Sequence, residues 1–219
     1  MLADRLARWA AVTVLYGAIL FALSGRWGDA LYWAYLAATS VAALVLVLTI
    51  DPELARERRR PGPGGIDRWR RVPMTVFLFA HLVVGTLDAG RYHWSDSVGP
   101  ALRGAGLLGS TAAMAWLVWA VAVNRFFSPV VRIQTERAHQ LVTRGPYRVV
   151  RHPGYLGMLL VPPCSALALG SWWALVPALV CTLLVLRRAV IEDRYLVRHL
   201  DGYQAYANTV RWRLLPGVW

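Results

Sequence analysis

The segment 144–157 combines basic, aromatic and chain-bending residues between two strongly hydrophobic regions. It contains the pairs Gly145-Pro146 and Pro153-Gly154, each followed by a tyrosine, with His152 between them. Glycine and proline interrupt a helix and let backbone groups approach a ligand closely. Basic side chains can bind an anion, and tyrosine rings offer π-faces to a cation. The segment therefore favours a cradle for a small charged ligand over a basic loop that only contacts phospholipid phosphates.

A second polar cluster follows the last hydrophobic region. Arg188 and Glu192 are four residues apart, so on a helix they share one face. An exposed ion pair of this kind stabilises a helix by only about 0.3–0.5 kcal/mol. At a membrane boundary, however, a carboxylate is costly to maintain, which favours a functional role. Asp193 is expected to point partly away from this face and is the weaker candidate.

Residue spacing argues against several other kinds of site. His139 and His152 have no helical or CxxC-type partner, so we expect no metal. Neither GxxxxGK[ST] nor GxGxxG occurs, and the serines and cysteines lack a local base–nucleophile arrangement. Cys164 and Cys181 fall in one hydrophobic region and are expected to be packed membrane residues. Hydrolytic and phosphate-loop chemistry are therefore not supported.

The composition places both clusters in a membrane protein. Hydrophobic residues make up 57% of the 219 and charged residues only 16%, a balance rarely found in a soluble domain of this length. A membrane-spanning helix needs about 20 apolar residues. The runs that approach or meet this length are 9–23 with its flanks, 30–50, 72–87 and 104–123.

A fifth hydrophobic region, 155–186, is too long for one simple span. Pro162-Pro163, Gly170-Ser171 and Pro177 would allow either one bent helix or a helical hairpin. We prefer the hairpin because it returns the chain to the side that it left. The expected fold is all-α: a multi-span integral membrane helical bundle of four spans plus a C-terminal helical hairpin.

The basic residues predict the orientation of this bundle, and all 24 of them are arginines. With the N-terminus inside, only Arg26, Arg91 and Arg103 fall on the outer side, a strong positive-inside pattern. The net charge of +12 then reflects topology and contact with anionic membrane lipids, and no recognition module supports nucleic-acid binding. We expect a cell (inner) membrane protein with a cytoplasmic N-terminus, a retained first span and an inner loop at 56–71.

The C-terminal motifs occur in a fixed order. The segments 139–147 (HQLVTRGPY) and 151–157 (RHPGYLG) are followed by Glu192-Asp193, Gly202-Tyr203 and Tyr206. This combination resembles the C-terminal half of isoprenylcysteine carboxyl methyltransferases, in a wider group that includes membrane phospholipid methyltransferases.

The resemblance covers residues 124–219, whereas the first half agrees only in being hydrophobic. We expect a single domain, 1–219, in which 1–123 forms the N-terminal spans and 124–219 the C-terminal catalytic half. The resemblance implies that S-adenosylmethionine is the methyl donor and that it binds on the cytosolic side.

The resemblance also implies roles for individual residues. Arg188 is expected to be catalytic and to face the methyl acceptor. The implied cofactor-binding residues are Gln134, His139, Gln140, Leu141, Val142, Tyr147, His152, Pro153, Gly154, Tyr155 and Glu192. The spacing of Gln134 is two residues short of the family pattern, and Asp193 stands where the family has a second glutamate.

The acceptor implied by the resemblance is lipophilic and held in the membrane. A carboxylate is favoured, because it is already anionic and needs no general base, whereas an amine or a thiol would need a deprotonation route. Prenylated protein C-termini are the family's best-known substrate. The lysine-free, alanine- and arginine-rich composition is typical of a GC-rich bacterial source, where such proteins would be unexpected. Small isoprenoid or fatty carboxylates, phospholipid amines and lipophilic thiols therefore stay open.

Two other classes of function are compatible with this sequence. One is a membrane NADPH-dependent reductase of the sterol or steroid type, whose C-terminal half is also polar and helical. The other is a non-enzymatic membrane lipid-binding protein. Measuring whether the protein binds S-adenosylhomocysteine or NADPH distinguishes a methyltransferase from the reductase. For the second, the test is whether the ionisable cluster closes into one concave pocket.

Overall fold

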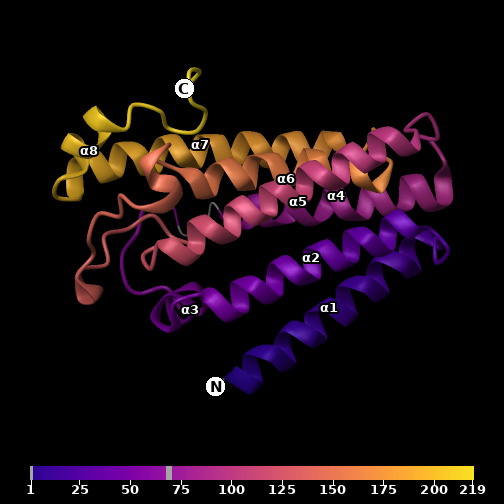
Figure 1. Cartoon of the computed structure of the whole chain (residues 1–219), viewed down its shortest axis with the longest axis horizontal. Helices are drawn as coiled ribbons and strands as arrows, with labels where there is room; N and C mark the ends of the chain where they lie inside the picture. Colours follow the sequence, from indigo (N-terminus) through magenta and orange to yellow (C-terminus); the bar gives the residue numbers. More distant parts are fainter. Residues whose placement is uncertain (1, 68–70) are drawn as a thin grey trace.

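The computed structural model describes residues 2–67 and 71–219 (Figure 1). Within these ranges every regular element is a helix, so the all-α prediction is confirmed. The long helices are α1 (Leu2–Ser24), α2 (Ala30–Thr49), α4 (Arg71–Leu87), α5 (Pro100–Val123), α6 (Pro153–Leu169) and α7 (Leu175–His199). The short ones are α3 (Pro52–Arg59), α8 (Tyr203–Thr209), the π-helical η1 (Asp88–Tyr92) and the 3₁₀ turns η2 (Thr135–Arg137) and η3 (Gly145–Arg148).

In the part of the chain that the structure describes, four helices are long and apolar enough to cross a membrane: Leu2–Ser24, Ala30–Thr49, Val72–Tyr92 and Pro100–Val123. They coincide with the four predicted runs. In α1 and α2 few side chains are buried against the rest of the protein, as expected for spans that face lipid rather than water. The chain is an integral membrane protein.

The fifth hydrophobic region forms the predicted hairpin. Gly170 ends α6 in the left-handed conformation (φ 84°), which glycine adopts at little steric cost. The Ser171 hydroxyl then accepts a hydrogen bond from the Ala174 amide at 3.0 Å and starts the return. The proline pair 162–163 lies inside α6 without ending it. Gly170, and not the prolines, therefore sets the position of the turn.

Helices α5 and α6 form the most extensive contact between two helices of the bundle. A Cβ atom on Gly106 would lie 2.5 Å from the Ala168 amide nitrogen, and one on Gly157 would lie 2.8 Å from the Ala113 carbonyl oxygen. Small residues at such positions let membrane helices pack backbone to backbone. This contact fixes the start of α6, which carries part of the candidate site.

The bundle has two distinct ends (Figure 1). The turns 25–29, 93–99 and 170–174 lie together at one end, called here the turn end. Helix α3, the segment 124–152 and α8 lie at the other, called the cavity end. The turn end carries the three arginines predicted to lie outside and is rich in accessible aromatic residues, as at a membrane interface. These aromatics are Trp27, Trp33, Tyr92, Trp94, Trp172 and Trp173.

The prediction of a loop over residues 56–71, at the cavity end, is wrong in its first part. Residues 56–59, expected as part of a loop, form the second half of α3. Asp51 caps this helix by accepting hydrogen bonds from the amides of Glu53 and Leu54, both at 2.9 Å, and Pro52 occupies the first turn, where its missing N–H costs nothing. Arg68 and Arg70, counted among the inner arginines, lie outside the described residues.

Candidate active site

A cavity of about 650 Å³ lies at the cavity end, within the range of small-molecule sites. One part is polar and aromatic, with His139, Gln140, Tyr147, His152, Tyr155, Arg188, Glu192 and Tyr203 in its wall. The other part is an apolar arm between helices, lined by Met74, Leu78, Leu117, Val121, Met158, Val161, Cys181 and Val185. The ionisable cluster therefore closes into one concave pocket with a hydrophobic extension.

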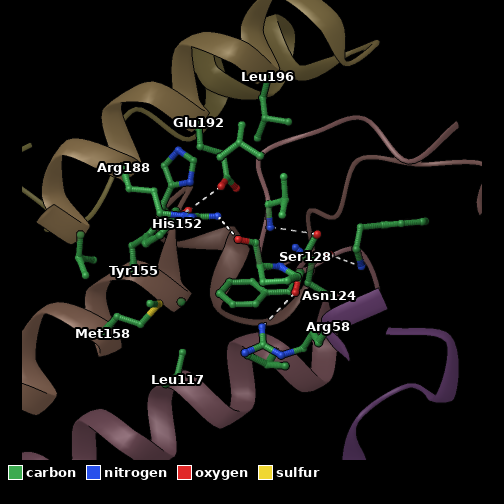
Figure 2. Close-up of a pocket in the computed structure, with 18 of the residues that line it drawn as sticks. Arg58, Leu117, Asn124, Ser128, His152, Tyr155, Met158, Arg188, Glu192 and Leu196 are labelled. Atoms are coloured by element: carbon green, nitrogen blue, oxygen red, sulfur yellow. Dashed lines mark hydrogen bonds between the residues drawn. The ribbon is translucent and has the colours of Figure 1, made fainter. Parts of the chain in front are cut away.

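Arg188 and Glu192 share the predicted face of α7 and are joined through Tyr155 (Figure 2). The Arg188 Nε donates to the Tyr155 hydroxyl at 2.8 Å, and that hydroxyl donates to Glu192 Oε2 at 2.6 Å. Arg188 Nη2 donates to the Pro129 carbonyl at 2.7 Å, and Nη1 lies 2.6 Å from Asp67 Oδ2. Arg188 is thus held on three sides, while Glu192 has a single recorded donor in the described part of the chain.

His152 is positioned from behind by a buried carboxylate. Its Nε2 lies 3.0 Å from Asp193 Oδ1, which also accepts a hydrogen bond from Tyr203 at 2.9 Å. Arg151 and Arg213 pair with the same carboxylate at 2.9 and 2.8 Å. Burial acts to raise the pKa of Asp193, but these hydrogen bonds outweigh it and hold the pKa well below its ordinary range. As expected, Asp193 is turned away from the cavity, which His152 lines.

His139 forms another part of the wall. Its ring stacks on Phe126 with centroids 4.5 Å apart, and its Nδ1 accepts a hydrogen bond from the Gln134 amide at 3.3 Å. Burial, with a smaller contribution from nearby arginines, lowers the pKa of His139 to about 4. The imidazole is therefore neutral at physiological pH.

Tyr147 is fixed at both its ends. Its hydroxyl accepts a hydrogen bond from Asn124 Nδ2 at 3.0 Å, and its carbonyl accepts one from the Tyr206 hydroxyl at 2.7 Å. Burial raises the pKa of Tyr147, so the phenol stays neutral. Asn124 also lines the cavity, although the sequence patterns did not single it out.

The motif glycine Gly154 has a packing role. A Cβ atom here would collide with the ring of Phe127. That ring in turn lies 6.5 Å from the Tyr155 ring, centroid to centroid, and both residues line the cavity. Glycine at 154 therefore leaves room for the aromatic wall.

All but two of the predicted site residues line this cavity. Those that do are His139, Gln140, Leu141, Val142, Tyr147, His152, Gly154, Tyr155, Arg188 and Glu192. Gln134 is fully buried beside it: its Nε2 donates to the Phe126 carbonyl at 2.7 Å and its Oε1 accepts from Arg137. Pro153 begins α6, and its carbonyl accepts a hydrogen bond from Trp116 at 3.0 Å.

Sequence patterns did not predict the contribution of α3. Glu57 pairs with Arg132 at 2.8 Å and accepts hydrogen bonds from Ser128 at 2.7 Å and the Gly62 amide at 3.1 Å. Burial acts to raise the pKa of Glu57, but the bonds from Arg132 and Ser128 outweigh it and lower the pKa to about 2. One signal was visible: Glu57 is the only acid among the arginines of 56–60.

Comparison with known proteins shows which family and which relatives part of this chain resembles. Residues 99–201 match the family described as phospholipid methyltransferase. The chain is 33% identical to the protein-S-isoprenylcysteine O-methyltransferase of Schizosaccharomyces pombe over 92 residues, which cover 41% of this chain and 39% of that protein. It is 50% identical over 40 residues to a probable protein-S-isoprenylcysteine O-methyltransferase of Oryza sativa subsp. japonica, covering 18% of this chain and 21% of that one. The matched stretches thus span well under half of these relatives.

Proposed function

We propose that this chain, whose residues 99–201 match the phospholipid methyltransferase family, is a member of that family and transfers a methyl group from S-adenosylmethionine to a lipophilic acceptor. One observation carries the proposal: a single cavity joins a charged, aromatic part to an apolar arm between helices. A polar donor and a hydrophobic acceptor need such adjoining environments.

The residues present fit the donor. S-adenosylmethionine carries a carboxylate, an ammonium and a sulfonium whose methyl group is electrophilic. Glu192 can accept hydrogen bonds from the ammonium, because Tyr155 is its single recorded donor among the described residues. His152, whose ring is held by Asp193, is proposed to contact the donor. Nearby amides can donate to the carboxylate of the donor, and the Tyr147 and Tyr155 rings suit the cationic region. Gln134, Pro153 and the segment 139–142 are also proposed to support donor binding.

A carboxylate is the acceptor that these side chains favour. Arg188 is already oriented by Tyr155, Pro129 and Asp67, so it can align an anionic oxygen at little entropic cost. Because a carboxylate is a nucleophile without deprotonation, no general base is required. Desolvation in the apolar arm would strengthen the contact with Arg188. The acceptor proposed is an isoprenoid-like or fatty carboxylate.

The proposal also includes the orientation of the bundle in the membrane. The arginine-rich cavity end is placed on the cytosolic side of the cell membrane by the positive-inside rule. The donor would then enter from the cytosol, and the acceptor would enter sideways from the bilayer. We place no metal and no nucleic acid in this reaction.

Titration with S-adenosylhomocysteine tests the donor site. The protein in lipid nanodiscs is expected to bind this product and to bind NADPH no better than background. Glu192→Gln should weaken binding by about 10- to 100-fold, because it removes a charged hydrogen bond. Asp96→Asn, on an accessible turn-end residue, is the matched control. Undetectable binding to the unaltered protein, or equal affinity in the Glu192 variant, would contradict the proposal.

Methyl transfer itself is measured with methyl-labelled donor and native membranes. Label should appear in a base-labile ester in the lipid fraction. Label in a base-stable amine or thioether would show that the acceptor is an amine or a thiol and not a carboxylate. The matched family and relatives are methyltransferases, so nothing supports the reductase alternative.

A further inference from the structure

Four arginines line the cavity, and two of them, Arg132 and Arg151, are paired with Glu57 and Asp193. The other two come from opposite halves of the chain. Arg188 comes from α7 and Arg58 from α3 (Figure 2). The three guanidinium nitrogens of Arg188 are each engaged by the protein, one of them by the carboxylate of Asp67 at 2.6 Å. Arg188 therefore already has a carboxylate partner before any ligand arrives.

Arg58 is more exposed than Arg188 and has fewer partners. Its Nη1 donates to the Phe127 carbonyl at 3.2 Å, and its guanidinium carbon lies 5.7 Å from the centre of the Phe127 ring. Among the described residues, no carboxylate forms an ion pair with it. The Arg58 residue is exposed by area, but desolvation by the protein around its guanidinium, and then the neighbouring charge of Arg188, lower the pKa of Arg58. An anion placed here would relieve that repulsion.

The backbone under Arg58 is well anchored. Leu54, one turn earlier, is fully buried, and the adjacent Glu57 is tied to Arg132. Helix α3 is also capped by Asp51. Helix α3 therefore holds the backbone of Arg58 at a fixed place beside the cavity.

The surroundings of Arg58 define what it could recognise. Leu46 of α2 and Val72 and Val76 of α4 line the same cavity, and both valines are accessible at the surface of the bundle. A ligand at this position would combine an anionic group beside Arg58 with a hydrocarbon chain along these helices.

We propose that Arg58 is a specificity-determining residue that binds the anionic group of the acceptor and selects lipophilic carboxylates over neutral analogues. This inference rests on the proposed function only in that the acceptor occupies this cavity. Arg188 then aligns the reacting oxygen, while Arg58 supplies the uncompensated charge that draws the anion in.

A pair of probes that differ only in charge tests this role. The probes are S-farnesyl-thiopropionic acid and its primary amide, titrated against the protein in zwitterionic phosphatidylcholine nanodiscs. The unaltered protein should bind the acid at least about tenfold more tightly, and Arg58→Gln should abolish that preference. Arg59→Gln is the matched control, since Arg59 bonds only to the Ala55 carbonyl of its own helix at 3.1 Å among the described residues. Unfolding temperatures confirm that both variants are folded.

Each outcome decides the inference. Equal binding of acid and amide by the unaltered protein, or a retained preference in Arg58→Gln, overturns it. A loss of affinity for both probes alike means that Arg58 contacts lipid headgroups or packs structurally, which also overturns it. An Arg58-dependent preference in a protein that fails to bind S-adenosylhomocysteine supports the anion site while rejecting methyl transfer.

Discussion

Both ends of the bundle carry charged side chains, but they use them differently. At the turn end, Arg103 pairs with Asp29 at 2.7 Å, and Asp88 accepts hydrogen bonds from Ser95 and Ser171. At the cavity end, Arg58 and Glu192 instead face a cavity. The difference shows that a buried ionisable residue in a membrane protein does not by itself mark a functional site. Hydrogen-bonding capacity that remains available inside a cavity is the better indicator.

The contacts at the turn end join helices that are distant in sequence. Arg103 connects α5 to the turn between α1 and α2, and Asp88 connects η1 to the turn between α6 and α7. Arg91 donates to the carbonyls of Leu23 and Ala22, both at 2.8 Å. These charges hold the spans in register while leaving the cavity end free to be shaped for ligands.

The largest expected effect is a loss of stability at the cavity end, on removal of the Asp193 carboxylate. Asp193→Ala leaves Arg151 and His152 buried without their shared carboxylate, which should reduce the free energy of unfolding by about 3–5 kcal/mol. Thermal unfolding in detergent measures the loss. Asp201→Ala, on an accessible residue, is the control and should change little. If both variants unfold at the same temperature, the Asp193 carboxylate does not stabilise the fold in this way.

A smaller effect is expected from Arg103→Ala at the turn end. Removing this side chain leaves Asp29 partly accessible to water, so the free energy of unfolding should fall by about 1–3 kcal/mol. The affinity for S-adenosylhomocysteine, measured well below the unfolding temperature, should stay unchanged. Arg26→Ala removes the longer 3.3 Å pair to the same carboxylate and should cost less, below about 1 kcal/mol. A joint loss of stability and ligand affinity in Arg103→Ala would break the distinction between the ends.

A pH dependence of stability is also expected at His139. Its folded-state pKa of about 4 lies below the value of about 6.5 for a free imidazole. The unfolded state therefore binds more protons between these values, and stability should fall as pH decreases from about 6.5 to 4. Unfolding temperatures across this range, compared with those of His139→Asn, isolate its contribution. Parallel curves for the two proteins would exclude it.

Much of the fold was predictable because its signals are local. Apolar runs of spanning length gave the four spans, and the glycine at 170 allowed the hairpin turn. Helical spacing placed Arg188 and Glu192 on one face, and the ordered motifs brought His152 and Tyr155 to the same cavity. Each inference needed only residues that are near in sequence.

The remaining parts depend on contacts that local spacing does not encode. Glu57 and Arg132 pair across 75 positions, so neither residue indicates the other and α3 was read as a loop. The expected position of Gln134 rested on its distance from His139, but one end of its side-chain amide bonds to the Phe126 carbonyl and the other to the Arg137 guanidinium. Without the three-dimensional arrangement, Arg58 is one of many arginines in a basic stretch.

The close approach of Gly154 to Phe127 links two positions that need to change together during evolution. A side chain at 154 would push the Phe127 ring away from Tyr155 and from Arg58, which lies over it. Related sequences that carry a larger residue at the position of Gly154 should therefore carry a smaller one at the position of Phe127. In those relatives the cavity wall beside Arg58 would be reshaped, and the range of acceptors should shift with it.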